Sequence, residues 1–98
     1  MDALGGAPVE RRLVVVGRVQ GVGFRWFARE TAHALGVAGW VRNMPDGTVV
    51  CEVGGPAEVV ERFAAELRAG PPAAEVLEVR VTARADDAPL PLRFSVVR

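Results

Sequence analysis

The sequence predicts an α+β domain in which two helices cover one face of an antiparallel sheet. Three observations support this prediction. Two segments carry apolar residues at helical spacing, and four others are rich in β-branched residues or alternate between apolar and polar. These segments follow one another as strand, helix, strand, strand, helix, strand, with a short extra strand at the end. The 98 residues are enough for one hydrophobic core, so a single domain is expected.

The first strand and the first helix have the clearest patterns. Residues 12–19, RLVVVGRV, are rich in β-branched residues and apolar on both faces, which is typical of a central strand. Residues 24–36 have helical spacing, and Gly36 ends this helix because glycine is favoured just past a helix end. The residues on the apolar face of the helix are Phe24, Phe27, Ala28, Thr31 and Leu35.

Two shorter strands follow, at residues 37–43 and 48–53, and the turn residues MPDG join them. The second of these strands alternates, so its successive side chains are expected on opposite faces of the sheet. Val49, Cys51 and Val53 point inward in this prediction, and Thr48, Val50 and Glu52 point the other way.

The second half of the chain supplies the other helix and the remaining strands. Gly55 and Pro56 precede the helix, with Pro56 suited to its first position, and Gly70, Pro71 and Pro72 end it. Its apolar stripe consists of Val59, Val60, Phe63 and Leu67. Residues 76–84 alternate as a strand, and residues 93–97 form a short last strand. The strand at 76–84 is expected to place Leu77, Val79, Val81 and Ala83 on one face.

This order of elements is that of a split β-α-β, or ferredoxin-like, sandwich with the first strand in a central position. The sheet then has four main strands plus the short last one. Residues 1–9 contain mostly small residues and glycines with nothing evident to pack against, so they are predicted to form a flexible tail. The folded domain is expected to span residues 10–98.

Composition excludes several classes of partner. The formal net charge is zero, from 12 basic and 12 acidic residues, so a broad positive field for nucleic acid or anionic membrane is lacking. No stretch approaches the roughly 20 apolar residues of a membrane span. Cys51 is the single cysteine, so neither an internal disulfide nor a cysteine metal cluster is expected. The start of the chain lacks a signal-peptide pattern. The sequence therefore favours a cytoplasmic monomer that holds no metal or cofactor.

The stretch GRVQGVGFR, residues 17–25, leads from the first strand into the first helix. It is not a P-loop, because Val22 and Gly23 follow Gly21 where lysine and Ser/Thr are required, and Trp26 stands where a dinucleotide fingerprint needs glycine. A glycine turn at a helix N-terminus is suited to bind a phosphate-like anion. Arg25 in the first helical turn is unfavourable unless an anion offsets it. The alternative is a tight turn beside a solvated arginine.

Asn43 is the second candidate site residue, at the end of a strand just before MPDG. It can cap the turn, or it can orient a water near a bound phosphate without adding a repelling charge. Two other polar residues have plainer interpretations. His33 lies off the apolar stripe and is expected at the surface, and Asp46 is expected to form the turn. Trp26 and Trp40 are interpreted as packing residues, either of which could border a ligand.

Two stretches together resemble the signatures of a known family. GRVQGVGFR, followed by GWVRNMPDGTV at 39–49 and by Gly55, is similar to the two signature stretches of acylphosphatases, and the resemblance extends over residues 12–98. It implies a ferredoxin-like fold and hydrolysis of small acyl phosphates to a carboxylate and inorganic phosphate, the latter a product and inhibitor. It also implies that Arg25 binds the phosphoryl group and that Asn43 positions the attacking water. The resemblance further implies a cradle of backbone N–H groups from Val19, Gln20, Gly21, Val22, Gly23, Phe24 and Arg25.

Such a substrate explains what the sequence lacks. The leaving group of an acyl phosphate is a stabilised carboxylate, so in-line attack by water needs no strong acid, metal or covalent intermediate. The main alternative is a regulatory module that binds phosphate or an acyl phosphate without hydrolysing it. RNA binding by the open sheet is a weaker alternative, because the chain has no tyrosine and its charge is balanced.

Overall fold

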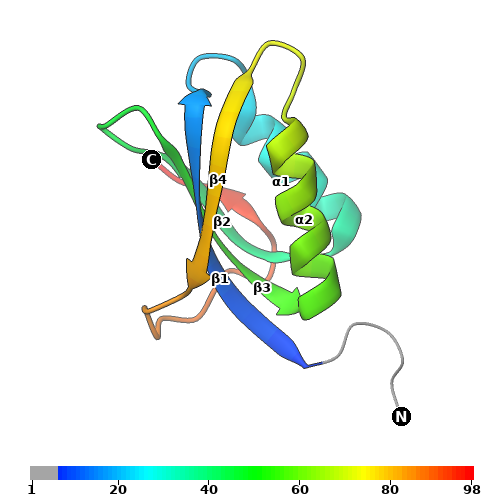
Figure 1. Ribbon diagram of the computed structural model, residues 1–98. Coiled ribbons are helices and arrows are strands. Elements are labelled where there is room, and N and C mark those ends of the chain that lie inside the picture. The colour runs from blue at the N-terminus through cyan, green and yellow to red at the C-terminus, as the bar shows by residue number, and fades with distance from the viewer. Residues whose placement is uncertain (1–6) are drawn as a thin grey trace.

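The computed structural model describes residues 7–98. Its elements are β1 (Pro8–Arg18), α1 (Phe24–Leu35), β2 (Ala38–Asn43), β3 (Val49–Pro56), α2 (Ala57–Ala69), β4 (Glu75–Ala83) and β5 (Ser95–Val96). The strands form one five-stranded sheet in the order β4-β1-β3-β2-β5. Both helices cover the same face of this sheet (Figure 1). The predicted ferredoxin-like sandwich, with β1 in the interior, is confirmed.

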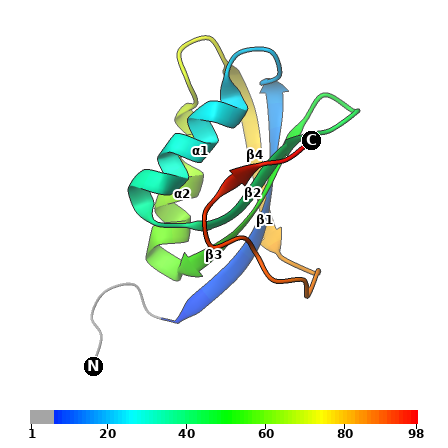
Figure 2. The ribbon, with the colours of Figure 1, turned by 180° about the vertical axis from the view of Figure 1, so that it is seen from behind.

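The sheet is antiparallel among its four main strands and mixed at one edge. β1 pairs with β3 and β4, and β2 pairs with β3, all antiparallel, whereas β5 runs parallel to β2. The view from behind shows β5 lying along β2, close to α1 (Figure 2). The C-terminal residues are thereby brought to the edge of the sheet where β2 ends.

The core lies between the sheet and the two helices. Leu13 and Val15 of β1, with Phe63 and Leu67 of α2, are fully buried there. Burial of each such side chain stabilises the fold by about 1.5–3 kcal/mol. The predicted stripe of α1 faces this core through buried Phe24 and Ala28 and half-buried Phe27, Thr31 and Leu35, and buried Ala32 completes it.

The ordered domain begins earlier than residue 10. Pro8 pairs with Pro56 and Val9 pairs with Gly55, so two residues that the sequence analysis assigned to the tail belong to β1. The tail predicted for the remaining residues falls on 1–6, which lie outside the described residues, and on exposed Ala7. Because β3 extends to Pro56, this proline is the N-cap of α2 and not its first helical residue.

The outward residues of β3 follow the predicted alternation but are not exposed. Val49, Cys51 and Val53 belong to the core, whereas Val50 and Glu52, outside it, are only 2% and 4% exposed. Glu52 accepts a hydrogen bond of 2.6 Å from Arg12 and another of 2.6 Å from Arg84, whose side chain is only 2% exposed. Glu10 binds the same Arg84 at 3.0 Å. A cluster of two arginines and two glutamates therefore covers this part of the sheet.

β4 departs from the predicted alternation at Leu77. The pairing of β1 with β4 shifts register between Val16 and Gly17, a β-bulge that leaves Leu77 without a partner and 72% exposed. Val76 and Val79 pack against the core instead. A Cβ at Gly17 would lie 2.1 Å from the carbonyl oxygen of Glu75, so the two backbones approach each other more closely than any side chain allows.

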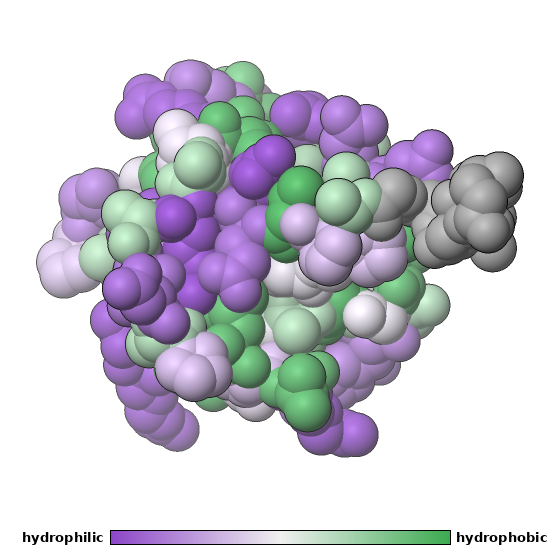
Figure 3. All heavy atoms as spheres, turned by 90° about the horizontal axis from the view of Figure 1, so that it is seen from below, coloured by the Kyte–Doolittle hydropathy of each residue, from purple (hydrophilic) through white to green (hydrophobic). Residues whose placement is uncertain are grey.

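The end of the molecule opposite the β1–α1 loop has a mixed surface, on which hydrophilic and hydrophobic side chains occur in small groups (Figure 3).

Among residues 7–98, no helix has both the length and the apolar character needed to span a membrane.

Candidate active site

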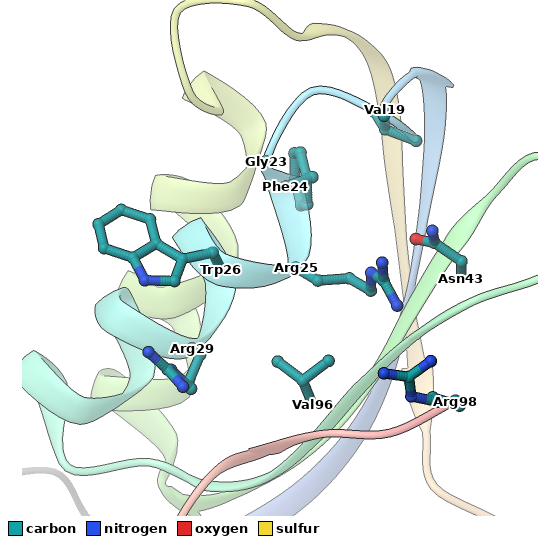
Figure 4. Close-up of a pocket in the computed structure, with 10 residues that line it drawn as sticks. Val19, Gly23, Phe24, Arg25, Trp26, Arg29, Asn43, Val96 and Arg98 are labelled. Atoms are coloured by element: carbon teal, nitrogen blue, oxygen red, sulfur yellow. The ribbon is translucent and has the colours of Figure 1, made fainter.

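A cavity of about 490 Å³ opens where the β1–α1 loop, the first turns of α1, the end of β2 and the C-terminal segment meet (Figure 4). The residues that line it are Val19, Gly21, Gly23, Phe24, Arg25, Trp26, Arg29, Asn43, Val96 and Arg98. Both residues singled out from the sequence, Arg25 and Asn43, are among them. The fold therefore brings together two side chains that are 18 positions apart in the chain.

The loop that precedes α1 makes the start of this helix suitable for an anion. Gly21 has φ +75°, and Gly23, the N-cap, has φ +79° and ψ +19°, a left-handed conformation that glycine adopts without strain. No side chain caps the helix, and its first turn contains no acidic residue. The first N–H groups of a helix have no partner within the helix, and they carry the positive end of its dipole. These donors are available to an anion in the cavity.

Five of the seven residues predicted to form the cradle line the cavity: Val19, Gly21, Gly23, Phe24 and Arg25. Gln20 and Val22 do not line it. Val22 is half-buried and packs against the core. The first glycine of the stretch, Gly17, is a strand residue that serves the contact of β1 with β4, and not part of the turn.

Arg25 extends from the first turn of α1 across the cavity toward Asn43 (Figure 4). Within residues 7–98, no acidic side chain forms a salt bridge with it. A guanidinium offers a rigid fork of donors that matches two phosphate oxygens at once. The cavity thus combines a helix N-terminus and a permanent cation, both of which favour a dianion.

Asn43 is the last residue of β2 and lies beside Val49 of β3. Its side-chain oxygen Oδ1 is buried and, among the described residues, has no hydrogen-bond partner. Leaving a buried acceptor unpaired costs about 1–3 kcal/mol, so such groups in native proteins are normally paired with water or a ligand. The amide group of Asn43 faces the side of the cavity on which Arg25 lies (Figure 4). The arrangement is suited to hold a water molecule next to an anion bound by Arg25.

Gln20 has a role that the sequence analysis did not predict. Its side-chain nitrogen Nε2 donates hydrogen bonds of 2.8 Å to the carbonyl oxygens of Met44 and Thr48. These two residues belong to the turn that follows Asn43, so Gln20 connects the β1–α1 loop to the β2–β3 turn. The sequence could not indicate this role, because both acceptors of the Gln20 amide lie more than 20 positions away along the chain.

A family model described as Acylphosphatase matches residues 11–96. This chain belongs to the acylphosphatase family. A curated acylphosphatase from Bordetella parapertussis is 54% identical to it over 67 residues, which cover 68% of this chain and 71% of that protein. Acylphosphatase from Bacillus subtilis has a crystal structure with a TM-score of 0.85 and 37% identity, covering 92% of this chain and 99% of that one. The crystal structure of full-length HypF, in its phosphate- and nucleotide-bound form, has a TM-score of 0.82 and 29% identity. That match covers 94% of this chain and 12% of HypF.

The resemblance found in the sequence is thereby confirmed, and with it the class of enzyme, an acylphosphatase-type hydrolase. Both signature stretches lie within the matched residues 11–96. Of the residues that line the cavity, only Arg98 falls outside this range. The cavity of this acylphosphatase is thus built almost wholly from the part that defines its family.

Three other polar residues considered in the sequence, His33, Cys51 and Asp46, do not line the cavity of this acylphosphatase and have contacts within the fold. His33 was expected at the surface, but it is half-buried, with Nε2 3.0 Å from the carbonyl oxygen of Phe94, because the C-terminal segment packs beside α1. Cys51 is fully buried, and burial raises the pKa of its thiol above its ordinary range, so it stays protonated in the core. Asp46 forms the turn as predicted: it accepts hydrogen bonds from the hydroxyl of Thr48 at 2.7 Å and from its backbone N–H at 3.0 Å.

The two tryptophans differ in position. Trp40 is half-buried on β2, with the guanidinium of Arg42 5.6 Å from the centre of its ring. Trp26 was interpreted as a packing residue, but it is 61% exposed at the cavity. Arg29, Val96 and Arg98 were not singled out in the sequence, because only the fold brings α1 and the C-terminal segment to one cavity. Within residues 7–98, no group of three or more His, Cys, Asp or Glu side chains is arranged to hold a metal ion.

Proposed function

We propose that this acylphosphatase hydrolyses small acyl phosphates by direct in-line attack of water, with Arg25 and the β1–α1 loop holding the phosphoryl group and Asn43 holding the water. The observation that carries this proposal is the buried Oδ1 of Asn43, which has no hydrogen-bond partner in the described part of the chain. It lies beside a cavity that also contains Arg25, a cation with no acidic partner among the same residues. An anion-binding site alone has no need for a neutral acceptor at this position. A site that must place a water next to the anion does.

Binding comes first. The phosphoryl oxygens accept hydrogen bonds from the Arg25 guanidinium and from backbone N–H groups between Val19 and Arg25. These donors are fixed by the fold before the substrate arrives, so little reorganisation is needed when negative charge shifts in the transition state. Inorganic phosphate presents similar oxygens to the same donors, so it is expected to bind as product and inhibitor.

The chemical step requires that the attacking water be placed in line with the bond that breaks. The Oδ1 of Asn43 accepts a hydrogen bond from water and holds its oxygen in line with the bond between phosphorus and the carboxyl oxygen. A bond forms from the water oxygen to phosphorus, the carboxyl–phosphorus bond breaks, and the carboxylate leaves with the electron pair. The proton of the water passes to an oxygen of the transferred phosphoryl group. Because the leaving group is a stabilised carboxylate, the scheme requires no metal, general acid or covalent intermediate.

The test is hydrolysis of benzoyl phosphate by the purified protein in the presence of a chelator. Arg25→Ala is expected to lower kcat/KM by about 10²–10³-fold and to weaken inhibition by phosphate, since it removes a preorganised donor. Asn43→Ala is expected to lower mainly kcat, with inhibition by phosphate close to that of wild type. Arg62→Ala is the matched control, because Arg62 is exposed on α2 outside the cavity. Full turnover by folded Asn43→Ala would refute the role of Asn43.

One rival function has a specific observation in its favour. The match to HypF covers only 12% of that chain, so a domain of this shape occurs within a larger protein whose structure was solved with phosphate and nucleotide. A module that binds phosphate without hydrolysis would show phosphate binding that depends on Arg25 and no turnover by folded wild type. The same experiment therefore separates the two functions.

The setting in which the enzyme works is also a proposal. A monomer is supported by the core, which is formed by both helices and the sheet within one chain, and the free, buried thiol of Cys51 suits the reducing cytoplasm. Analytical ultracentrifugation of the purified protein at several concentrations checks the first statement. A mass of two chains at micromolar concentration would contradict it.

A further inference from the structure

Two exposed apolar side chains gather at the cavity. Among residues 7–98, the large hydrophobic side chains that remain exposed are Trp26, Leu77, Val81, Leu92 and Val96. Trp26, 61% exposed, and Val96, 39% exposed, both line the candidate active site, although they come from α1 and β5. The core does not require Trp26, because the neighbouring Phe24 and Phe27 make the aromatic contact inside, with ring centres 5.8 Å apart. An exposed apolar surface in a ligand cavity indicates contact with an apolar part of the ligand.

The direction of attack decides which part of the ligand that is. In an in-line displacement, the attacking and leaving oxygens lie on opposite sides of phosphorus. Asn43, which is proposed to hold the water, lies on one side of Arg25. The indole of Trp26 extends from α1 on the other side, away from Arg25, and Val96 lies between these two ends of the cavity (Figure 4). The leaving acyl group therefore points away from Asn43 and toward Trp26 and Val96.

The charges around the cavity favour an uncharged acyl group. Arg25, directly before Trp26 in sequence, is already assigned to the phosphoryl group. Arg29, three positions after Trp26, is engaged by Glu30, with hydrogen bonds of 3.1 and 3.3 Å to one carboxylate oxygen. Arg98 lies near Asn43, on the side proposed for the water (Figure 4). The side proposed for the acyl group thus presents apolar surface next to a cation whose charge is offset.

We propose that Trp26 and Val96 form an apolar subsite for the acyl group. This enzyme then favours acyl phosphates with flat, apolar acyl groups over those with small polar ones. The inference rests on the proposed function, because in-line attack places the acyl group. Trp26 supplies a flat indole face for stacking, and Val96 supplies an aliphatic contact on the adjacent wall. Trp26 is thus a specificity-determining residue and not part of the phosphoryl chemistry.

The test measures binding without turnover. The probes are phenacylphosphonate and acetonylphosphonate, which carry a methylene group in place of the scissile oxygen and differ in having a phenyl or a methyl group. Wild type is expected to bind the phenyl compound about 10-fold more tightly, the gain typical of one aromatic contact. Trp26→Ala is expected to remove most of this preference, and Trp26→Phe to keep most of it. Leu77→Ala, which removes an equally exposed side chain on β4, is the control and should keep the full preference.

The outcomes separate the inference from the proposed function. The proposed apolar subsite is refuted if wild type binds the two phosphonates with equal affinity, or if Trp26→Ala leaves the preference intact. If Trp26→Ala loses the preference and wild type does not hydrolyse benzoyl phosphate, the apolar subsite is supported and the hydrolase mechanism is refuted. Hydrolysis with the ratio of kcat/KM for benzoyl over acetyl phosphate reduced about 10-fold in Trp26→Ala supports both.

Discussion

The side-chain nitrogen of Gln20 lies 2.8 Å from the carbonyl oxygen of Met44, the residue that directly follows Asn43. This hydrogen bond, and a second of 2.8 Å to the carbonyl oxygen of Thr48, connect the loop proposed to bind the anion to the turn that directly follows Asn43. Gln20, which does not line the cavity, thus connects the two halves of the site beyond the pairing of the strands. We expect it to act as a positioning residue.

Gln20→Ala is expected to lower kcat by about 10-fold or more, because misplacement of reacting groups by a fraction of an ångström is costly. Both carbonyl oxygens keep another donor: Gly47 N–H for Met44 and Met44 N–H for Thr48. The free energy of unfolding is therefore expected to fall by only about 1–2 kcal/mol. Steady-state kinetics and urea denaturation measure the two effects. Unchanged kcat in a variant that is destabilised by this amount would show that the contact serves stability alone.

Gly17→Ala is expected to reduce the free energy of unfolding by at least about 2 kcal/mol, since the added Cβ meets backbone atoms that cannot move aside. That Cβ would lie 2.1 Å from the carbonyl oxygen of Glu75 and 2.9 Å from the nitrogen of Leu77. Gly21→Ala is the matched control, because it also has a positive φ, +75°, but nothing within 4 Å of its Cβ. It should lose only the cost of the left-handed backbone, about 1–2 kcal/mol. Equal losses in urea denaturation would refute the tight approach at Gly17.

Glu52→Gln is expected to destabilise the protein by about 3–5 kcal/mol, because it removes the negative charge that directly contacts the buried guanidinium of Arg84. The hydrogen bond that Arg84 donates to Glu52 outweighs the effect of desolvation and raises the pKa of Arg84 above its ordinary value. Glu78→Gln removes a comparable ion pair with Arg80 at 2.9 Å, but there both side chains are about half exposed. This control is expected to leave the free energy of unfolding almost unchanged, because solvent screens the exposed pair. Thermal or urea unfolding of both variants measures the contrast, which would vanish if the buried cluster contributed no more than a surface pair.

The turn after β2 is expected to make stability depend on acid pH. The side-chain hydrogen bond from Thr48, followed by the backbone one, holds the pKa of Asp46 below its usual value of 3.8. A carboxyl with a lowered pKa in the folded state contributes stability above its unfolded pKa, and this contribution disappears as pH falls through the folded pKa. Wild type should therefore be more stable than Asp46→Ala at neutral pH, and the difference should shrink below pH 3.8. Urea denaturation of both proteins at a series of pH values would contradict this if the difference stayed constant.

Local patterns in the sequence determined the elements and much of the site. Helix α1 ends at Gly36 as predicted, in a left-handed cap, because apolar spacing and glycine conformation depend on neighbouring residues. Arg25 could be singled out for a similar reason, because an arginine at a helix start is unfavourable unless an anion offsets it. Asn43 by its local setting alone indicates a turn residue, and only the expected fold and the family resemblance made it a site candidate.

Tertiary structure decided what depends on partners far along the chain. Leu77 continues an alternation that the sequence presents as unbroken, yet the bulge opposite Gly17 turns it to solvent. Glu52 alternates like an outward residue, yet two arginines, 40 and 32 positions away, bury it. Trp26 and Val96 meet at one cavity only because β5 pairs with β2. The spacing of apolar residues along a helix or strand depends on neighbouring residues. Strand register and ion pairing arise from contacts that form only when distant segments pack together.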